Sequence, residues 1–221
     1  MLKVSGLDAR IGPVPILHDV ELSVEEGEMC GLIGRNGAGK TTFMRAVMGL
    51  VPATGTIDLG HIDLMAVHPH RRPHFGLGYM PEDRRLVPEL TVEENLMLPA
   101  WSMRVEGAEG RLAWILGLMP EIEPFRYRRS IQLSGGQQKM VALGRALMAG
   151  TRLLLLDEPF EGLAPALARR LAEVLSNLKD EGVSVLVAES NETHVADLLD
   201  RIFHIERGQV LEHPSPRRAV S

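Results

Sequence analysis

The sequence predicts an α/β fold in which buried parallel strands alternate with helices. Near-continuous apolar runs at Met29–Ile33, Arg152–Asp157 and Val183–Ala188 are typical of strands that are covered on both faces. A helix is expected after each run, over Thr41–Met48, Ala166–Asp180 and Glu192–Leu199. This alternation is the pattern of a parallel sheet with helices on its faces.

Shorter strand patterns flank this core. Residues Leu2–Val24 look rich in strands, and His18–Val24 alternates apolar and polar side chains. Because Gly55–Leu64 has the pattern of two short strands, a small antiparallel sheet is expected beside the parallel one. Further strands are predicted over Gly76–Pro81 and, as a terminal hairpin, over Arg201–Glu206 and Gln209–Glu212, followed by a frayed polar tail.

A helical region, Asp83–Ile131, is inserted into the α/β pattern. Thr91 and Glu94 have the spacing of a capping box, in which each side chain accepts from the other residue's backbone N–H. We therefore expect a helix to begin directly after Thr91. Two more helices are predicted, over Arg111–Leu118 and Gln137–Met148.

The stretch Gly34–Thr42, GRNGAGKTT, fits the spacing G-x-x-x-x-G-K-[ST] of a phosphate-binding loop. Glycines let consecutive backbone N–H groups curl around a phosphate chain, and the following helix directs its positive end at the same anion. Lys40 can reach the β- and γ-phosphates, and the Thr41 hydroxyl is placed to ligate Mg²⁺. The candidate nucleotide contacts are Gly34, Asn36, Gly37, Ala38, Gly39, Lys40, Thr41 and Thr42.

Two adjacent carboxylates, Asp157 and Glu158, follow a buried apolar strand. Open α/β sheets bind ligands at this end of their strands. Asp157 can hold Mg²⁺ directly or through water, and Glu158 can accept a proton from a water that attacks the γ-phosphate. A helix-capping acid is the alternative, which the upstream phosphate loop makes the weaker interpretation.

Composition excludes several classes of protein. The 221 residues hold 24 Lys and Arg against 29 Asp and Glu, a net charge of −5 that argues against non-specific nucleic-acid binding. Cys30 is the only cysteine, so no internal disulfide can form, and a reducing, cytoplasmic setting fits. We find no signal-peptide pattern and no apolar run long enough to span a bilayer, so a membrane role would require a partner.

Four histidines, at positions 61, 68, 70 and 74, lie close together in the sequence. A metal site is one interpretation and a solvated loop is the other. We favour the loop, because Pro69 and Pro73 interrupt any helix that would align the ligands.

The stretch Leu133–Lys139, LSGGQQK, distinguishes this chain from other proteins with a phosphate loop. Together with the loop and LLLLDE at Leu153–Glu158, it resembles an ATP-binding cassette (ABC) ATPase over essentially the whole chain. The resemblance implies one nucleotide-binding domain over residues 1–221, with a RecA-like core, an antiparallel β subdomain and a helical subdomain over residues 83–147. It also implies ATP and Mg²⁺, and a head-to-tail dimer in which Ser134, Gly135, Gly136 and Gln137 close over the partner's ATP.

The motifs around Pro81–Leu96, Gly144–Met148 and Leu153–Pro165 are similar to the branched-chain amino acid importers, and most to their LivF-like cassettes. This implies a second cassette as partner, a second copy or a LivG-like subunit, and transmembrane permease subunits. A substrate-binding protein would act indirectly, and the cassette would lie on the cytoplasmic face of the membrane. Urea and amide uptake systems share these features, so the transported solute stays open.

Four positions depart from the family pattern, one of them Ala164, which stands where many cassettes carry an aspartate that reaches the partner subunit. Ile11 stands where an aromatic ring usually stacks on adenine, and Glu82 replaces the glutamine that senses Mg²⁺ and water. Ser190 stands where many cassettes carry a histidine that contacts the γ-phosphate. We hypothesise that the ATP site built on this chain's phosphate loop hydrolyses more slowly than its mate.

Two other functions compete with an importer cassette. A soluble ABC ATPase of translation or DNA repair usually carries two cassettes or a long coiled coil, and this chain has neither. A non-hydrolytic nucleotide sensor would fit Ile11 and Ser190, but the intact Lys40, Asp157 and Glu158 argue against it.

Overall fold

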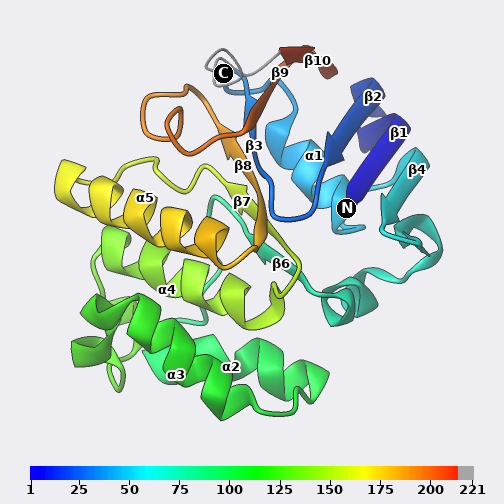
Figure 1. Cartoon of the computed structure of the whole chain (residues 1–221). Helices are drawn as coiled ribbons and strands as arrows, with labels where there is room; N and C mark the ends of the chain where they lie inside the picture. Colours follow the sequence, from blue (N-terminus) through cyan, green and yellow to red (C-terminus); the bar gives the residue numbers. More distant parts are fainter. Residues whose placement is uncertain (214–221) are drawn as a thin grey trace.

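The computed structural model describes residues 1–213, which form two β-sheets and a set of helices packed around them (Figure 1). The frayed tail predicted after Glu212 lies, from residue 214 onward, outside the described residues. The predicted α/β fold is confirmed, with the parallel strands in one sheet and the amino-terminal strands in another.

The larger sheet has six strands in the order β10-β9-β3-β8-β7-β6. Its parallel strands include the three predicted apolar runs, as β3 (Met29–Ile33), β7 (Leu153–Asp157) and β8 (Ser184–Glu189). The remaining strands are β6 (Leu77–Met80), β9 (Arg201–Glu206) and β10 (Gln209–His213), of which only β10 runs antiparallel to its neighbour.

The smaller sheet is antiparallel, in the order β2-β1-β4-β5. It contains β1 (Leu2–Ile11), β2 (Val14–Val24), β4 (Ala53–Leu59) and β5 (Ile62–Asp63). The predicted small sheet is therefore confirmed, and Gly60 lies at the turn between its two short strands.

Helices surround the six-stranded sheet. Helix α1 (Lys40–Val47) contacts strands of both sheets. Helices α2 (Val92–Met103), α3 (Ala108–Leu118), α4 (Gly135–Ala149) and α5 (Pro165–Asp180) gather on the opposite side (Figure 1). Short 3₁₀ helices occupy Leu64–Ala66, Pro69–Phe75, Pro120–Phe125 and Ser130–Gln132.

Strand alternation divides the apolar core into two clusters. In β7, Leu154 and Leu156 pack toward the helices α2 to α5, whereas Leu153 and Leu155 pack toward α1 and the smaller sheet. All four side chains are fully buried, because each face of the strand has its own layer of apolar partners. The apolar run in the sequence follows from this two-sided burial.

The capping box predicted at Thr91 is confirmed, and it sets the start of α2. Thr91 Oγ1 accepts from the backbone N–H of Glu94 at 3.2 Å, and Glu94 Oε2 accepts from the N–H of Thr91 at 2.7 Å. Such reciprocal bonds satisfy two donors that the first helical turn leaves without partners.

The helix predicted over Glu192–Leu199 is wrong, because this segment forms a series of turns. Its two buried apolar residues, Val195 and Leu199, are four positions apart, which is also helical spacing. Turns closed by Ala196 N–H to Glu192 O at 2.9 Å and by Leu199 N–H to Val195 O at 3.2 Å bring both into the core. Leu199 packs against Gly31, where an added Cβ would lie 2.5 Å from the Leu199 side chain.

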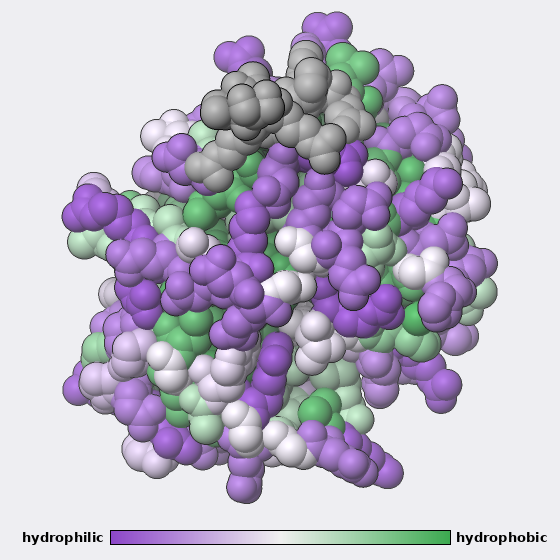
Figure 2. Space-filling view, viewed as in Figure 1, coloured by the Kyte–Doolittle hydropathy of each residue, from purple (hydrophilic) through white to green (hydrophobic). Residues whose placement is uncertain are grey.

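Within residues 1–213, no helix is long and apolar enough to cross a membrane. The face seen in Figure 2 is mainly hydrophilic, with apolar side chains scattered in small groups.

Candidate nucleotide-binding site

The phosphate loop connects β3 to α1, as its spacing predicts, and close packing fixes two of its glycines, Gly34 and Gly39. A Cβ on Gly34 would lie 2.3 Å from the carbonyl oxygen of Ile205. Gly39 has φ of +117° and caps α1, and a Cβ there would press on Leu17 at 2.9 Å. Any larger residue at either position would therefore displace the loop.

The Lys40 ammonium lies at the centre of the loop. It donates to the carbonyl oxygen of Gly34 at 2.6 Å and lies 3.0 Å from Glu158 Oε1. Both side chains are almost completely buried, and β7 brings Glu158 to this place from 118 residues further along the chain. The two predicted charges thus form one buried ion pair at the mouth of the loop.

Asp157 lies beside the loop at the end of β7. Its Oδ1 accepts from the Thr41 hydroxyl at 3.1 Å, and its Oδ2 accepts from the Tyr79 hydroxyl at 3.3 Å. Burial, with a contribution from the nearby Glu82 charge, raises the pKa of Asp157 to about 6. The predicted pair of magnesium ligands, Thr41 and Asp157, is therefore in direct contact.

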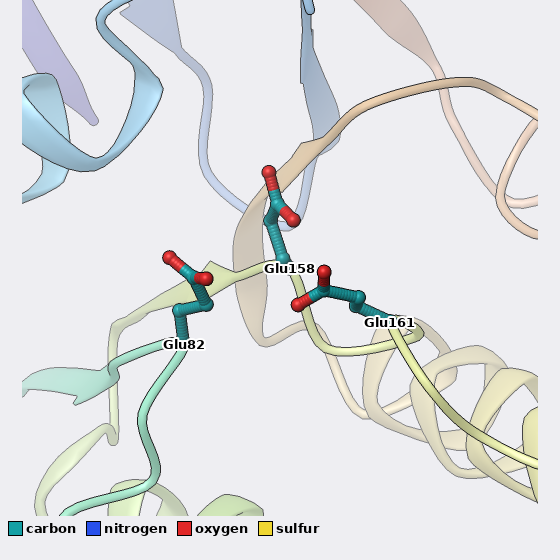
Figure 3. A group of neighbouring side chains, drawn as sticks. All are labelled: Glu82, Glu158 and Glu161. Carbon is teal, nitrogen blue, oxygen red and sulfur yellow. The ribbon is translucent and has the colours of Figure 1, made fainter. Parts of the chain in front are cut away.

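Glu82, Glu158 and Glu161 bring their carboxylates together where β6 and β7 end (Figure 3). One oxygen from each lies within 4.8 Å of the others. Glu82 and Glu161 are exposed, whereas Glu158 is buried. Hydroxyl and carboxylate oxygens are the donors that Mg²⁺ prefers, so Thr41, Asp157 and Glu82 suit that ion chemically. Because a cation would offset the crowding of like charges, the electrostatics fit it as well.

The Ser190 hydroxyl lies between the phosphate loop and Glu158. Its hydroxyl lies 2.7 Å from Asn36 Oδ1 in the phosphate loop and 3.1 Å from Glu158 Oε1. The side chain is thus within reach of the residues predicted to surround the γ-phosphate, although it replaces an imidazole with a shorter hydroxyl.

A hollow of about 330 Å³ opens over the phosphate loop. Its lining brings together many of the predicted residues: Ile11, Ile16, Asn36, Gly37, Gly39, Lys40, Thr41, Thr42, Glu82 and Glu158. Ile11 is 49% exposed and lines the hollow together with Ile16, so aliphatic side chains stand where stacking was expected to be weak.

The residues Ser134–Gln137 do not line this hollow. They form the start of α4, where Ser134 Oγ accepts from the N–H of Gln137 at 3.3 Å and Gln137 Oε1 accepts from the N–H of Ser134 at 2.9 Å. Ser134 and Gly135 are exposed. This capped helix end is therefore exposed and separate from the hollow over the chain's own phosphate loop.

Three residues at the site were not predicted from the sequence. Tyr79 donates to Asp157, Glu189 accepts from the loop after β7, and Lys139 donates to that same loop. Two weak signals in the sequence could have indicated them. Glu189 is a charged residue at the end of an apolar strand, and Lys139 is a lysine beside apolar residues of α4.

The histidine stretch gives no metal site in the described part of the chain. Within residues 1–213, the one group of three potential ligands is the glutamate cluster of Figure 3. His68 and His70 instead stack on each other, with ring centroids 5.8 Å apart.

Comparison with protein families gives a match to the ABC transporter family over residues 17–161. The chain is 35% identical to a high-affinity branched-chain amino acid transport ATP-binding protein, BraG of Pseudomonas aeruginosa, over 96% of this chain and 92% of that one. It is 34% identical to LptB of Escherichia coli, a lipopolysaccharide export system ATP-binding protein (91% and 85%), and 30% identical to a probable LivF of Archaeoglobus fulgidus (95% and 90%).

Solved structures with a similar fold are also ATP-binding cassettes. A dimeric ATP-binding cassette in a post-hydrolysis state bound to ADP and Pi superimposes with a TM-score of 0.86 and 26% identity, over 97% of this chain and 98% of that one. An ATP-binding cassette of an ABC transporter in its ADP conformation gives 0.83 and 27% identity, over 97% and 91%. The predicted resemblance, down to the branched-chain amino acid branch, is confirmed. The chain belongs to the ABC transporter family and is an ATP-binding and ATP-hydrolysing cassette.

Proposed function

We propose that this cassette energises an importer for branched-chain or other amino acids. The observation that carries the catalytic part is the buried pair of Lys40 and Glu158, which lie 3.0 Å apart beside Asp157 and Thr41. The substrate class is supported by two relatives whose names refer to branched-chain amino acid transport.

In this proposal the phosphate loop binds the triphosphate of ATP, and Glu158 activates the attacking water. The Lys40 ammonium neutralises phosphate charge, while the Glu158 carboxylate, buried beside it, orients the water and accepts its proton. Ser190 holds Glu158 from the other side through its hydroxyl. Thr41, Asp157 and Glu82 would hold Mg²⁺, which neutralises charge on the transferred phosphoryl group when bound.

The second half of each ATP site would come from a partner cassette. The capped start of α4, Ser134–Gln137, is exposed and lies outside the hollow over its own phosphate loop. A partner's γ-phosphate would meet the N–H groups of this helix end. The dimeric cassette with the similar fold supports such a pairing, with a second copy or a LivG-like subunit.

We also infer that residues 83–147 form a helical subdomain within one cassette spanning residues 1–221. It would dock on transmembrane permease subunits and hold the cassette at the cytoplasmic face of the membrane. A substrate-binding protein would deliver the solute to those permeases, and nucleic acid has no part in this function.

The first experiment measures ATP hydrolysis and ATP binding for the full chain and for Glu158→Gln. The variant removes the proton acceptor but keeps the side chain's shape, so we expect hydrolysis to fall by at least about 100-fold with binding retained. Glu173→Gln on α5, an exposed glutamate that pairs with Arg170, is the control. A chain that binds ATP but never hydrolyses it would instead be a nucleotide sensor.

The transported solute needs its own experiment, because a lipopolysaccharide export relative is almost as similar as the amino acid relatives. The cassette is co-purified with its permease subunits and reconstituted in vesicles. ATP-dependent uptake of radiolabelled leucine, urea and a short-chain aliphatic amide is then measured. Stimulated leucine uptake supports the proposal. Failure to recover any permease would favour a soluble ABC ATPase.

A further inference from the structure

Helix α4 carries a buried lysine that contacts the loop after β7 but does not line the hollow over the phosphate loop. Lys139 follows the capped start of the helix at Ser134 by little more than one turn, and it is 6% exposed. Burial lowers its pKa, since an ammonium loses hydration in the interior. A buried charge is retained only where it has strong partners, so the contacts of this ammonium define its role.

The partners are two carbonyl oxygens of the loop after β7. Lys139 Nζ donates to the carbonyl oxygen of Glu158 at 2.7 Å and to that of Glu161 at 2.5 Å. These residues begin and end a tight turn, in which the Glu161 N–H donates to the same Glu158 oxygen at 3.3 Å. Figure 3 shows the loop that runs from Glu158 to Glu161. One ammonium therefore ties both ends of the turn to α4.

The opposite side of the turn is held by β8. Glu189 Oε1 accepts from the Phe160 N–H at 3.0 Å, and the Glu158 N–H donates to the carbonyl oxygen of Ala188 at 2.9 Å. The backbone between Glu158 and Glu161 is thus fixed by a cation on one side and a carboxylate on the other.

This support matters because the Glu158 backbone is strained. Its φ of +48° is left-handed, a conformation that is unfavourable for a residue with a Cβ and persists only where the surroundings enforce it. The conformation also directs the carboxylate toward Lys40 and Ser190. If the two carbonyl oxygens lost their donor, the turn could relax and move the carboxylate away from the attacking water.

We propose that Lys139 is a positioning residue for ATP hydrolysis. It does not line the hollow over the phosphate loop, and it acts by fixing the backbone of Glu158 and tying it to the helix that begins at Ser134. The inference rests on the ATPase activity of the family and on the proposed role of Glu158.

The test compares Lys139→Met with Lys179→Met in the full chain. Methionine keeps the length of the side chain and removes the charge and its donors. Lys179, on α5, is the matched control, because it too pairs through its ammonium, with Asp200 Oδ1 at 2.5 Å, but away from the loop. We expect Lys139→Met to lower kcat by about 10- to 100-fold, with KM and the Kd for ATP within about twofold.

A third variant, Lys139→Arg, keeps the charge and several donors, and should recover part of kcat. The melting temperature of each variant, with and without ATP, separates positioning from stability. A purely structural lysine would lower the melting temperature without changing kcat of the folded fraction, and that result overturns the proposal. An equal loss of kcat in the Lys179→Met control would overturn it too.

Glu158→Gln distinguishes this inference from the proposed role of Glu158. If that variant hydrolyses ATP normally, the proposed function fails, whatever Lys139→Met does. If Glu158→Gln loses hydrolysis but Lys139→Met retains normal kcat, the positioning inference fails and the proposed role of Glu158 stands. Where Lys139→Met does not fold at the assay temperature, Lys139→Gln, which retains a shorter donor, is measured against the same thresholds.

Discussion

Two buried carboxyl groups at the ends of β7 and β8 have raised pKa values. Burial is the main cause for both, and it raises the pKa of Asp157 to about 6 and that of Glu189 to about 7. Glu189 is also close to the Glu158 charge, although its bonds from the backbone of Phe160 and Ser190 oppose the shift. Both groups hold a proton at pH values where the same side chains in an unfolded chain have lost it.

Glu189 should therefore make the folded chain less stable as pH rises. A group whose folded pKa is raised adds stability that is complete below its unfolded pKa, about 4.5, and is lost as pH rises to about 7. We predict that Glu189→Gln removes this loss, which amounts to about 3 kcal/mol from the difference in pKa. Urea unfolding at pH 5 and pH 8 measures it. Parallel pH profiles for the wild type and the variant would contradict the prediction.

Helix α4 is the element on which the packing of the helical layer depends. Gly144 lies against α2 and α3, and a Cβ there would come within 2.6 Å of Leu96 and 3.1 Å of Ile115. Gly136 lies against α5, where a Cβ would come within 2.4 Å of Leu167. Small residues at these two points let the helices on either side approach α4 closely.

A pair of glycine-to-alanine variants tests this packing. Gly144→Ala should destabilise the chain by roughly 1–3 kcal/mol, because the added methyl overpacks the contact with Leu96. Gly110→Ala in α3 has open space around its Cβ, so it should stabilise the chain by roughly 0.5–1 kcal/mol through helix propensity. Thermal melts of the two variants should move in opposite directions. Upward shifts in both variants would show that helix propensity, rather than close packing, controls these positions.

At the scale of the whole molecule, polar contacts connect the helical layer to α5. The Trp114 indole N–H on α3 donates to Glu181 Oε2 at 3.0 Å, just beyond the end of α5. Arg170 on α5 donates to Glu121 Oε1 at 3.0 Å and to the carbonyl oxygen of Leu118 at 2.6 Å. These contacts join α3 and the segment that follows it to α5.

In an assembled transporter with two different cassettes, the two ATP sites should be unequal. Ser190 offers only a hydroxyl, 3.1 Å from Glu158, where many cassettes have an imidazole. We predict that Glu158→Gln in this chain reduces transport less than the equivalent change in the partner cassette. The measurement is ATP-dependent uptake by vesicles that contain each variant pair. Equal losses from the two changes would contradict the asymmetry.

The sequence by itself determined the elements that depend on local pattern. Apolar runs predicted β3, β7 and β8, and the spacing of Gly34–Thr42 predicted the loop between β3 and α1. The Thr91 capping box predicted the start of α2. These predictions succeeded because buried strands, phosphate loops and helix caps each require particular residue types at short, fixed separations.

Only the tertiary structure decided how distant residues combine. A helix was expected over Glu192–Leu199, but successive turns bury Val195 and Leu199 there without a continuous helix. Likewise, nothing in the local sequence around Lys139 indicates that its ammonium reaches the carbonyl oxygen of Glu158, 19 positions away. Such contacts depend on how α4 packs against the end of β7, and packing is a property of the assembled layers rather than of any one segment.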